Sequence, residues 1–123
     1  MFVLDYEANA TFDRLKNTLD PFVNMIRSKY PTVPIVIISK IKMFDENHDL
    51  ERAKIEKMIR DYQKNYVSNK NDDHLYYISG ANIFGKKHIH EKTVDGCHPT
   101  DYGFMSIAEY LYPKFKLILE KEH

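Results

Sequence analysis

The sequence predicts an α/β fold in which a parallel sheet is covered by helices on both faces. Three short apolar runs, at Phe2–Leu4, Ile35–Ile38 and Leu75–Ile78, are continuous rather than alternating, which is typical of strands buried on both faces. Segments with a helical spacing of apolar residues separate and follow these runs. Strands that alternate with helices indicate right-handed crossovers, and therefore parallel strands.

Three helices are expected between and after these strands. The first spans residues 11–30 and divides in two, because Asp20 is a good N-cap residue and Pro21 suits a first helical position. The others span about 49–68 and 100–119, and Pro113 should kink or split the last one. The residues of these two helices expected to face inward are Ile55, Met58, Ile59, Tyr62, Tyr66, Phe104, Ile107, Ala108, Leu111 and Phe115.

The composition is that of a globular chain with one domain over residues 1–123. Hydrophobic residues make up 43% and charged residues 29% of the chain, and 18 lysines and arginines balance 18 aspartates and glutamates. A neutral chain lacks the electrostatic attraction that dominates binding to phosphate backbones, so no nucleic-acid partner is expected. Cys97 is the only cysteine, which excludes an internal disulfide and a CxxC motif.

No targeting or membrane segment is expected. No apolar run approaches the roughly 20 residues of a membrane helix. Met1 to Leu4 runs directly into Asp5, without the basic region and the long apolar stretch of a signal peptide. This start is typical instead of a buried strand whose preceding part is missing.

The segment 93–103 contains the richest set of reactive side chains. Asp95 and His98 lie three residues apart around Gly96, which permits a tight turn. A carboxylate in such a turn can hold one ring nitrogen of the histidine and leave the other free to act as a base. The alternative interpretation is that Asp95 only caps a turn and that His98 is an ordinary surface residue.

The sequence DGCHP at residues 95–99, followed by TDYG and an apolar helical segment, resembles the DxxHP block near the C-terminus of SGNH/GDSL hydrolases. The resemblance implies a partial flavodoxin-like three-layer α/β/α sandwich that retains three parallel strands. It also implies ester hydrolysis without a metal or organic cofactor. The family's histidine is the catalytic base and its aspartate orients the histidine, which assigns these roles to His98 and Asp95.

The segment VLDYEAN at residues 3–9 resembles the family's third block, whose asparagine side chain donates a hydrogen bond to the oxyanion. The resemblance assigns this role to Asn9, and one such donor typically accelerates a reaction by about 100- to 1000-fold. The common form of the block is Gly-x-Asn-Asp, whereas Glu7 and Ala10 stand in the flanking places here. Asn9 is also suited to cap the helix that follows.

The family's nucleophile, the serine of a Gly-Asp-Ser motif, has no counterpart in this sequence. The serines are Ser28, Ser39, Ser68, Ser79 and Ser106, and none follows Gly-Asp. Ser39 and Ser79 end predicted strands, where chemistry gathers in parallel sheets, but both are interpreted as structural. The resemblance therefore implies the C-terminal portion of an ester hydrolase domain, inactive alone. The competing interpretation is a non-catalytic, truncated module that self-associates.

A second group, His88-Ile89-His90 with Glu91, Asp95 and His98, offers ligands for zinc or another divalent cation in a metal-dependent hydrolase. Two histidines two residues apart in a loop are a weak signal, and nearby lysines repel a cation. No metal is therefore expected. His48 and His74 are given no role.

The first strand is expected to mediate self-association. In the strand order 2-1-3-4-5 that the resemblance implies, this strand lies beside a missing one, so here it becomes an edge. It contains no charge, proline or bulge before Asp5, the features that usually protect sheet edges. A homodimer or higher oligomer is expected through Phe2, Val3 and Leu4. The parent enzyme's other expected partner is a small-molecule, carbohydrate or lipid ester.

Overall fold

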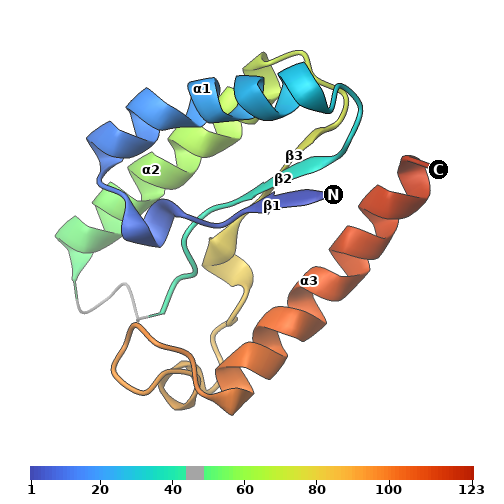
Figure 1. Cartoon of the computed structure of the whole chain (residues 1–123). Helices are drawn as coiled ribbons and strands as arrows, with labels where there is room; N and C mark the ends of the chain where they lie inside the picture. Colours follow the sequence, from blue (N-terminus) through green and yellow to red (C-terminus); the bar gives the residue numbers. More distant parts are fainter. Residues whose placement is uncertain (44–48) are drawn as a thin grey trace.

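The sheet is parallel and three-stranded. The computed structural model describes residues 1–43 and 49–123, so His48 lies outside the described residues. The strands are β1 (Phe2–Leu4), β2 (Ile35–Ile38) and β3 (Leu75–Ile78), in the order β1-β2-β3. Phe2 pairs with Ile35, and Ile35 pairs with Leu75. The predicted α/β class and the three predicted strands are confirmed (Figure 1).

Helices cover both faces of the sheet, which gives three layers (Figure 1). One face carries α1 (Phe12–Lys29) and α2 (Leu50–Asn69), and the other carries α3 (Asp101–Lys121). Short 3₁₀ helices lie in the described connections: η1 (Glu7–Asn9) follows β1, and η3 (Gly80–Asn82) and η4 (Ile89–Glu91) lie between β3 and α3. No helix in the described part of the chain combines the length and apolar character needed to cross a bilayer.

Each face of the sheet has its own apolar core. The four residues of β2 are all buried, because alternate side chains point to opposite faces and both faces are covered. The cluster under α1 and α2 contains Leu4, Leu19, Val23, Ile26, Ile35, Ile37 and Leu75. The cluster under α3 contains Val36, Ile38, Ile41, Ile78, Ile83, Phe84 and Ile89.

The prediction that the first helix divides at Asp20 is wrong. α1 is one helix that contains Pro21, and its buried residues Leu19 and Val23 lie on either side of the proline. An interior proline costs roughly 3 kcal/mol, and the burial of one continuous apolar face offsets that cost. The Asp20 carboxylate does not cap a second helix but accepts hydrogen bonds from Tyr66 and other residues near the end of α2.

The expected split at Pro113 is also absent, because α3 continues through the proline (Figure 1). Pro113 cannot donate to the carbonyl of Glu109, four residues earlier. Both residues lie on the exposed side of α3. Water can therefore hydrogen-bond to the freed carbonyl, and the helix tolerates the proline.

The predicted inward faces of the last two helices are partly wrong. α2 buries Glu56, Arg60 and Gln63, whereas Ile55 is 52% exposed and Met58 48% exposed. Ion pairs explain the difference, since the buried Glu56 carboxylate contacts Lys40, Arg52 and Arg60. On α3, Ile107, Leu111 and Phe115 are half-buried, but Phe104 and Ala108 are exposed, because no described element covers their side of the helix.

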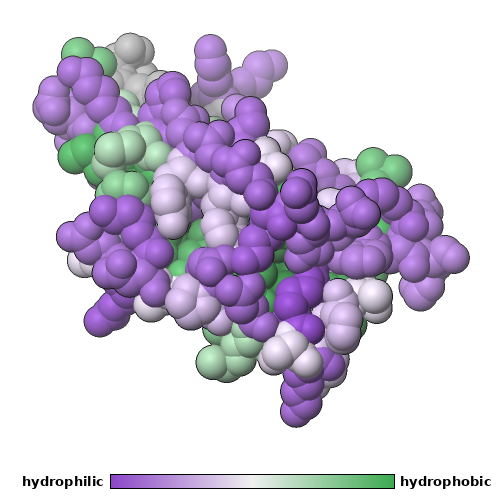
Figure 2. Space-filling view, turned by 90° about the horizontal axis from the view of Figure 1, so that it is seen from above, coloured by the Kyte–Doolittle hydropathy of each residue, from purple (hydrophilic) through white to green (hydrophobic). Residues whose placement is uncertain are grey.

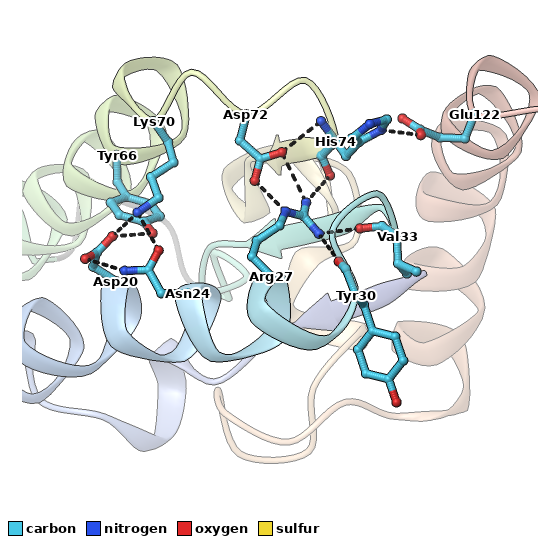
Figure 3. A network of polar contacts seen from close by, with 10 residues as sticks. All are labelled: Asp20, Asn24, Arg27, Tyr30, Val33, Tyr66, Lys70, Asp72, His74 and Glu122. Carbon is cyan, nitrogen blue, oxygen red and sulfur yellow. Dashed lines mark hydrogen bonds and ion pairs between the residues drawn. The ribbon is translucent and has the colours of Figure 1, made fainter.

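A polar network ties the amino ends of the strands together (Figure 3). The Arg27 guanidinium, on α1, donates to the Asp72 carboxylate at 2.6 Å and to the carbonyl oxygens of Val33 and His74. The His74 ring contacts Glu122 beyond the end of α3 at 2.5 Å. These contacts fix the end of the sheet opposite the candidate site. The outer surface of α1 and α2 is mainly hydrophilic (Figure 2).

Candidate active site

The candidate catalytic residues lie at the carboxyl end of the sheet. Asn9 ends η1, the segment directly after β1, and Asp95 and His98 lie in the loop between β3 and α3. Figure 1 shows both segments at the same end of the sheet. This is the edge at which parallel sheets generally bind ligands.

Asp95 and His98 are in direct contact. Nδ1 of His98 lies 2.6 Å from Oδ2 of Asp95. The other oxygen, Oδ1, accepts hydrogen bonds from the backbone N–H groups of His98 at 2.7 Å and of Cys97 at 2.9 Å. One carboxylate oxygen therefore caps the turn while the other holds the imidazole ring, so Asp95 does more than cap the turn.

The same contacts determine the charge of the carboxylate. Hydrogen bonds from the backbone N–H and the ring of His98, and from the backbone N–H of Cys97, lower the pKa of Asp95 to about 2. An ionised carboxylate can only accept hydrogen bonds, so the hydrogen between the two atoms is assigned to Nδ1 of His98. In the neutral ring Nε2 then carries the lone pair, and no residue within 1–43 or 49–123 hydrogen-bonds to it. Nε2 is therefore open to a ligand.

Backbone contacts shape the turn that carries the pair. Thr93 and Pro99 form an antiparallel bridge, and the Val94 N–H donates to the His98 carbonyl at 2.9 Å. Gly96 has a φ of +80°, a left-handed conformation that a residue with a Cβ atom adopts at a cost. The hairpin-like turn therefore places Asp95 and His98 on the same short segment with little freedom between them.

Sequence reasoning missed the residues that fix this turn to the fold. Lys92 is 7% exposed, and its Nζ donates to the Phe84 carbonyl at 2.6 Å. The Lys92 carbonyl accepts from the Thr100 N–H at 3.0 Å. A Cβ atom at Gly103 would lie 2.1 Å from that carbonyl oxygen. One signal in the sequence could have revealed this close contact: Gly103 stands in the first turn of a helix, where alanine is otherwise favoured.

Asn9 is exposed, and its side chain makes no hydrogen bond to another residue in the described part of the chain. It does not cap the following helix, because the Thr11 side chain is the N-cap of α1 and accepts from the Arg14 N–H at 3.2 Å. No contact joins Asn9 to Asp95 or His98 among the described residues. The amide is thus free to donate to a ligand at this edge.

The hydroxyls of all five serines are engaged elsewhere. Ser39 is fully buried, and its hydroxyl accepts from the Gly80 N–H at 2.9 Å and from the Tyr77 hydroxyl at 3.0 Å. Ser79 caps η3. The remaining three donate to backbone carbonyls of their own helices: Ser28, Ser68 and Ser106. None of these contacts involves His98.

The histidines proposed as metal ligands do not converge. Nδ1 of His88 lies 2.9 Å from Oε1 of Glu91, and Asp95 is instead paired with His98. Within residues 1–43 and 49–123, no three histidine, cysteine or acidic side chains are placed to hold one metal ion. The geometry of these residues gives no support to a metal-dependent site.

Comparisons with known proteins identify the family of the chain. Residues 1–116 match the model of the GDSL-like lipase/acylhydrolase family. The fold is similar to the crystal structure of a protein from Bacteroides ovatus ATCC 8483 assigned to the GDSL-like lipases, with a TM-score of 0.82 and 29% identity. That alignment covers 97% of this chain and 36% of the other, so the chain spans about a third of that protein's length. No curated protein gives a significant match. The chain belongs to the GDSL-like lipase/acylhydrolase family.

Proposed function

We propose that this chain is the C-terminal portion of a serine ester hydrolase domain and carries two members of its catalytic triad. His98 is the general base and Asp95 is the group that orients it. The observation that carries the proposal is the 2.6 Å contact between His98 Nδ1 and Asp95 Oδ2, at the carboxyl end of a parallel sheet in a chain of this family. A serine from outside these 123 residues completes the triad.

The reaction follows from these roles. Nε2 of His98 takes the proton of the serine hydroxyl as the serine oxygen attacks the acyl carbon of the ester. The Asn9 amide donates to the oxyanion that forms. His98 then gives its proton to the leaving alcohol, which produces an acyl-enzyme. Water attacks the acyl carbon as His98 takes the water's proton, and His98 then gives that proton to the serine oxygen as the acid is released. Asp95 remains ionised throughout.

The exposure of the pair supports a site whose other walls lie outside these residues. The His98 side chain is 75% exposed and that of Asp95 is 49% exposed. Hydrogen bonds to a developing oxyanion are effective where water is excluded. The resemblance implies a lipid acyl ester or an acetylated sugar as the substrate. The family's chemistry requires no metal or organic cofactor.

The isolated chain tests the proposed source of the nucleophile. We expect hydrolysis of p-nitrophenyl acetate by the purified chain to equal that of its His98→Ala variant, because the base has no serine to activate. Circular dichroism of both proteins verifies that they are folded. Turnover that the variant loses would contradict the proposal, and Ser39→Ala and Ser79→Ala would then identify an internal nucleophile.

A second candidate is a non-catalytic module that self-associates. One observation favours it: β1 is an edge strand in the described sheet, and its Val3 side chain is 42% exposed. The two candidates differ in what His98 does. If the chain is a non-catalytic module, His98→Ala should leave ester hydrolysis unchanged even when a nucleophile is supplied. If it is part of a hydrolase, the same change should abolish ester hydrolysis.

A further inference from the structure

Glu7 is an unusual residue for its position. Its side chain is buried, with 5% of the residue exposed, and it begins η1, two residues before Asn9. Burying a carboxylate is costly unless hydrogen bonds satisfy it. Oε2 of Glu7 accepts two, from the backbone N–H of Lys40 at 2.7 Å and from Nε2 of Gln63 at 2.5 Å. The carboxylate therefore joins η1 to the end of β2 and to the middle of α2.

The partners of Glu7 are themselves fixed. Gln63 is 1% exposed. Lys40 follows the fully buried Ser39, whose hydroxyl accepts the Gly80 N–H. The carboxylate is thus held between the segment after β2 on one side and a buried amide on the other. An anchor with such partners can define the position of the backbone that carries it.

No other side chain of η1 is buried, and Tyr6 before it is only partly buried against the core under α1 and α2. Glu7 is the only buried residue between Leu4 and Leu15. The backbone contacts within η1, from Asn9 N to the Tyr6 carbonyl at 3.0 Å and from Ala10 N to the Glu7 carbonyl at 3.1 Å, form one 3₁₀ turn. Such short turns have poor hydrogen-bond geometry and are weak alone.

We propose that Glu7 is the positioning residue for Asn9. The Asn9 amide makes no hydrogen bond to another described residue, so its location depends on the backbone of η1, and that backbone depends on Glu7. The inference rests on the proposed role of Asn9 as oxyanion donor. It also explains why this chain departs from the Gly-x-Asn-Asp form, since Glu7 stands where the glycine usually does and holds the turn through its side chain.

Amide hydrogen exchange and ¹⁵N NMR of the intact chain test the proposal. Glu7→Ala should accelerate exchange at the Asn9 and Ala10 N–H groups by about 10- to 100-fold and shift the Asn9 side-chain signals, because two hydrogen bonds to a buried carboxylate are lost. Glu7→Gln keeps an acceptor oxygen and should restore the wild-type spectrum of Asn9. The Val94 N–H, in the turn of Asp95 and His98, should be unchanged in both variants.

Two controls make the result decisive. Glu51→Ala removes a carboxylate that is 81% exposed and should leave the Asn9 signals unchanged. Gln63→Leu removes one donor to Glu7 and should move them by less than Glu7→Ala does, so it replaces Glu7→Ala if that variant does not fold. Asn9 signals that stay at wild-type positions in the folded variants would overturn the proposal. The readout needs no catalysis, so a failure of Asn9 as oxyanion donor would appear separately, as an active Asn9→Ala enzyme.

Discussion

The His98 ring and the Asp95 carboxylate are joined twice within one turn. Nδ1 of His98 lies 2.6 Å from one carboxylate oxygen, and the backbone N–H of the same histidine donates to the other oxygen at 2.7 Å. Among the described residues the hydrogen bonds of the two side chains stay within the turn, so the pair is assembled locally. It forms as soon as the turn forms, and residues 79–100 then place it at the carboxyl end of the sheet.

The first prediction concerns the acid limit of this turn. The folded pKa of Asp95, about 2, lies below its ordinary value of 3.8, so the ionised form stabilises the fold. That contribution is complete above about pH 4 and is lost as the pH falls through about 2. ¹³C NMR of the Asp95 carboxyl should show a midpoint near 2, and His98→Ala should raise it. A midpoint near 3.8 in the unmodified chain would contradict the geometry.

The second prediction is that Gly103→Ala destabilises the chain. Helix propensity alone predicts a gain of about 1 kcal/mol. The added Cβ would lie 2.1 Å from the Lys92 carbonyl oxygen, and such overpacking typically costs about 1–3 kcal/mol. Urea unfolding measures the difference. The reverse change at an exposed position of α3, Ala108→Gly, should cost about 1 kcal/mol, and a Gly103→Ala variant more stable than wild type would refute the close packing.

The third prediction is that the isolated chain self-associates through β1. Phe2 N donates to Pro34 at 2.8 Å, so the backbone groups of Val3 point toward the free edge, away from β2. Phe2 and Leu4 pack toward α1, which leaves Val3 as the side chain available at the contact. Light scattering coupled to size exclusion should find a dimer or larger species.

A matched pair of variants tests that edge. Val3→Lys should shift the chain toward monomer, since a charge on an edge strand opposes pairing. Met25→Lys, at a residue of α1 that is 67% exposed, should leave the oligomeric state unchanged. A wild-type chain that is monomeric at micromolar concentration would show that the edge does not mediate association.

The sequence predicted the strands and the Asp95–His98 turn because both depend on local signals. Continuous β-branched runs mark buried strands, and a three-residue spacing around Gly96 is enough to close the turn. The predictions that were wrong concern features that depend on tertiary contacts or on solvent access. Pro21 and Pro113 are tolerated because tertiary packing or solvent access offsets a lost hydrogen bond. Glu56 pairs with Arg52 and Arg60 within α2 and with Lys40 after β2, and the contact with Lys40 is one that no spacing pattern within α2 reveals.

The fourth prediction compares Asn9 and His98 in a working enzyme. A hybrid in which residues 1–123 replace the matching region of the Bacteroides ovatus protein would supply the rest of the domain. Asn9→Ala in this hybrid should lower kcat by about 100- to 1000-fold, because one oxyanion donor is lost. His98→Ala should lower it more, by about 10,000-fold or more, because the nucleophile is no longer activated. An Asn9→Ala hybrid with full activity would remove Asn9 from the site.

The hybrid enzyme also tests the role of His98 most directly. The decisive measurement is kcat/KM for p-nitrophenyl acetate before and after His98→Ala, with His88→Ala as the control, since His88 lies in the same connection and is 58% exposed. We predict that the hybrid hydrolyses the ester, that His98→Ala abolishes this activity and that His88→Ala leaves it unchanged. Hydrolysis that survives His98→Ala would contradict the assignment of His98 as the base.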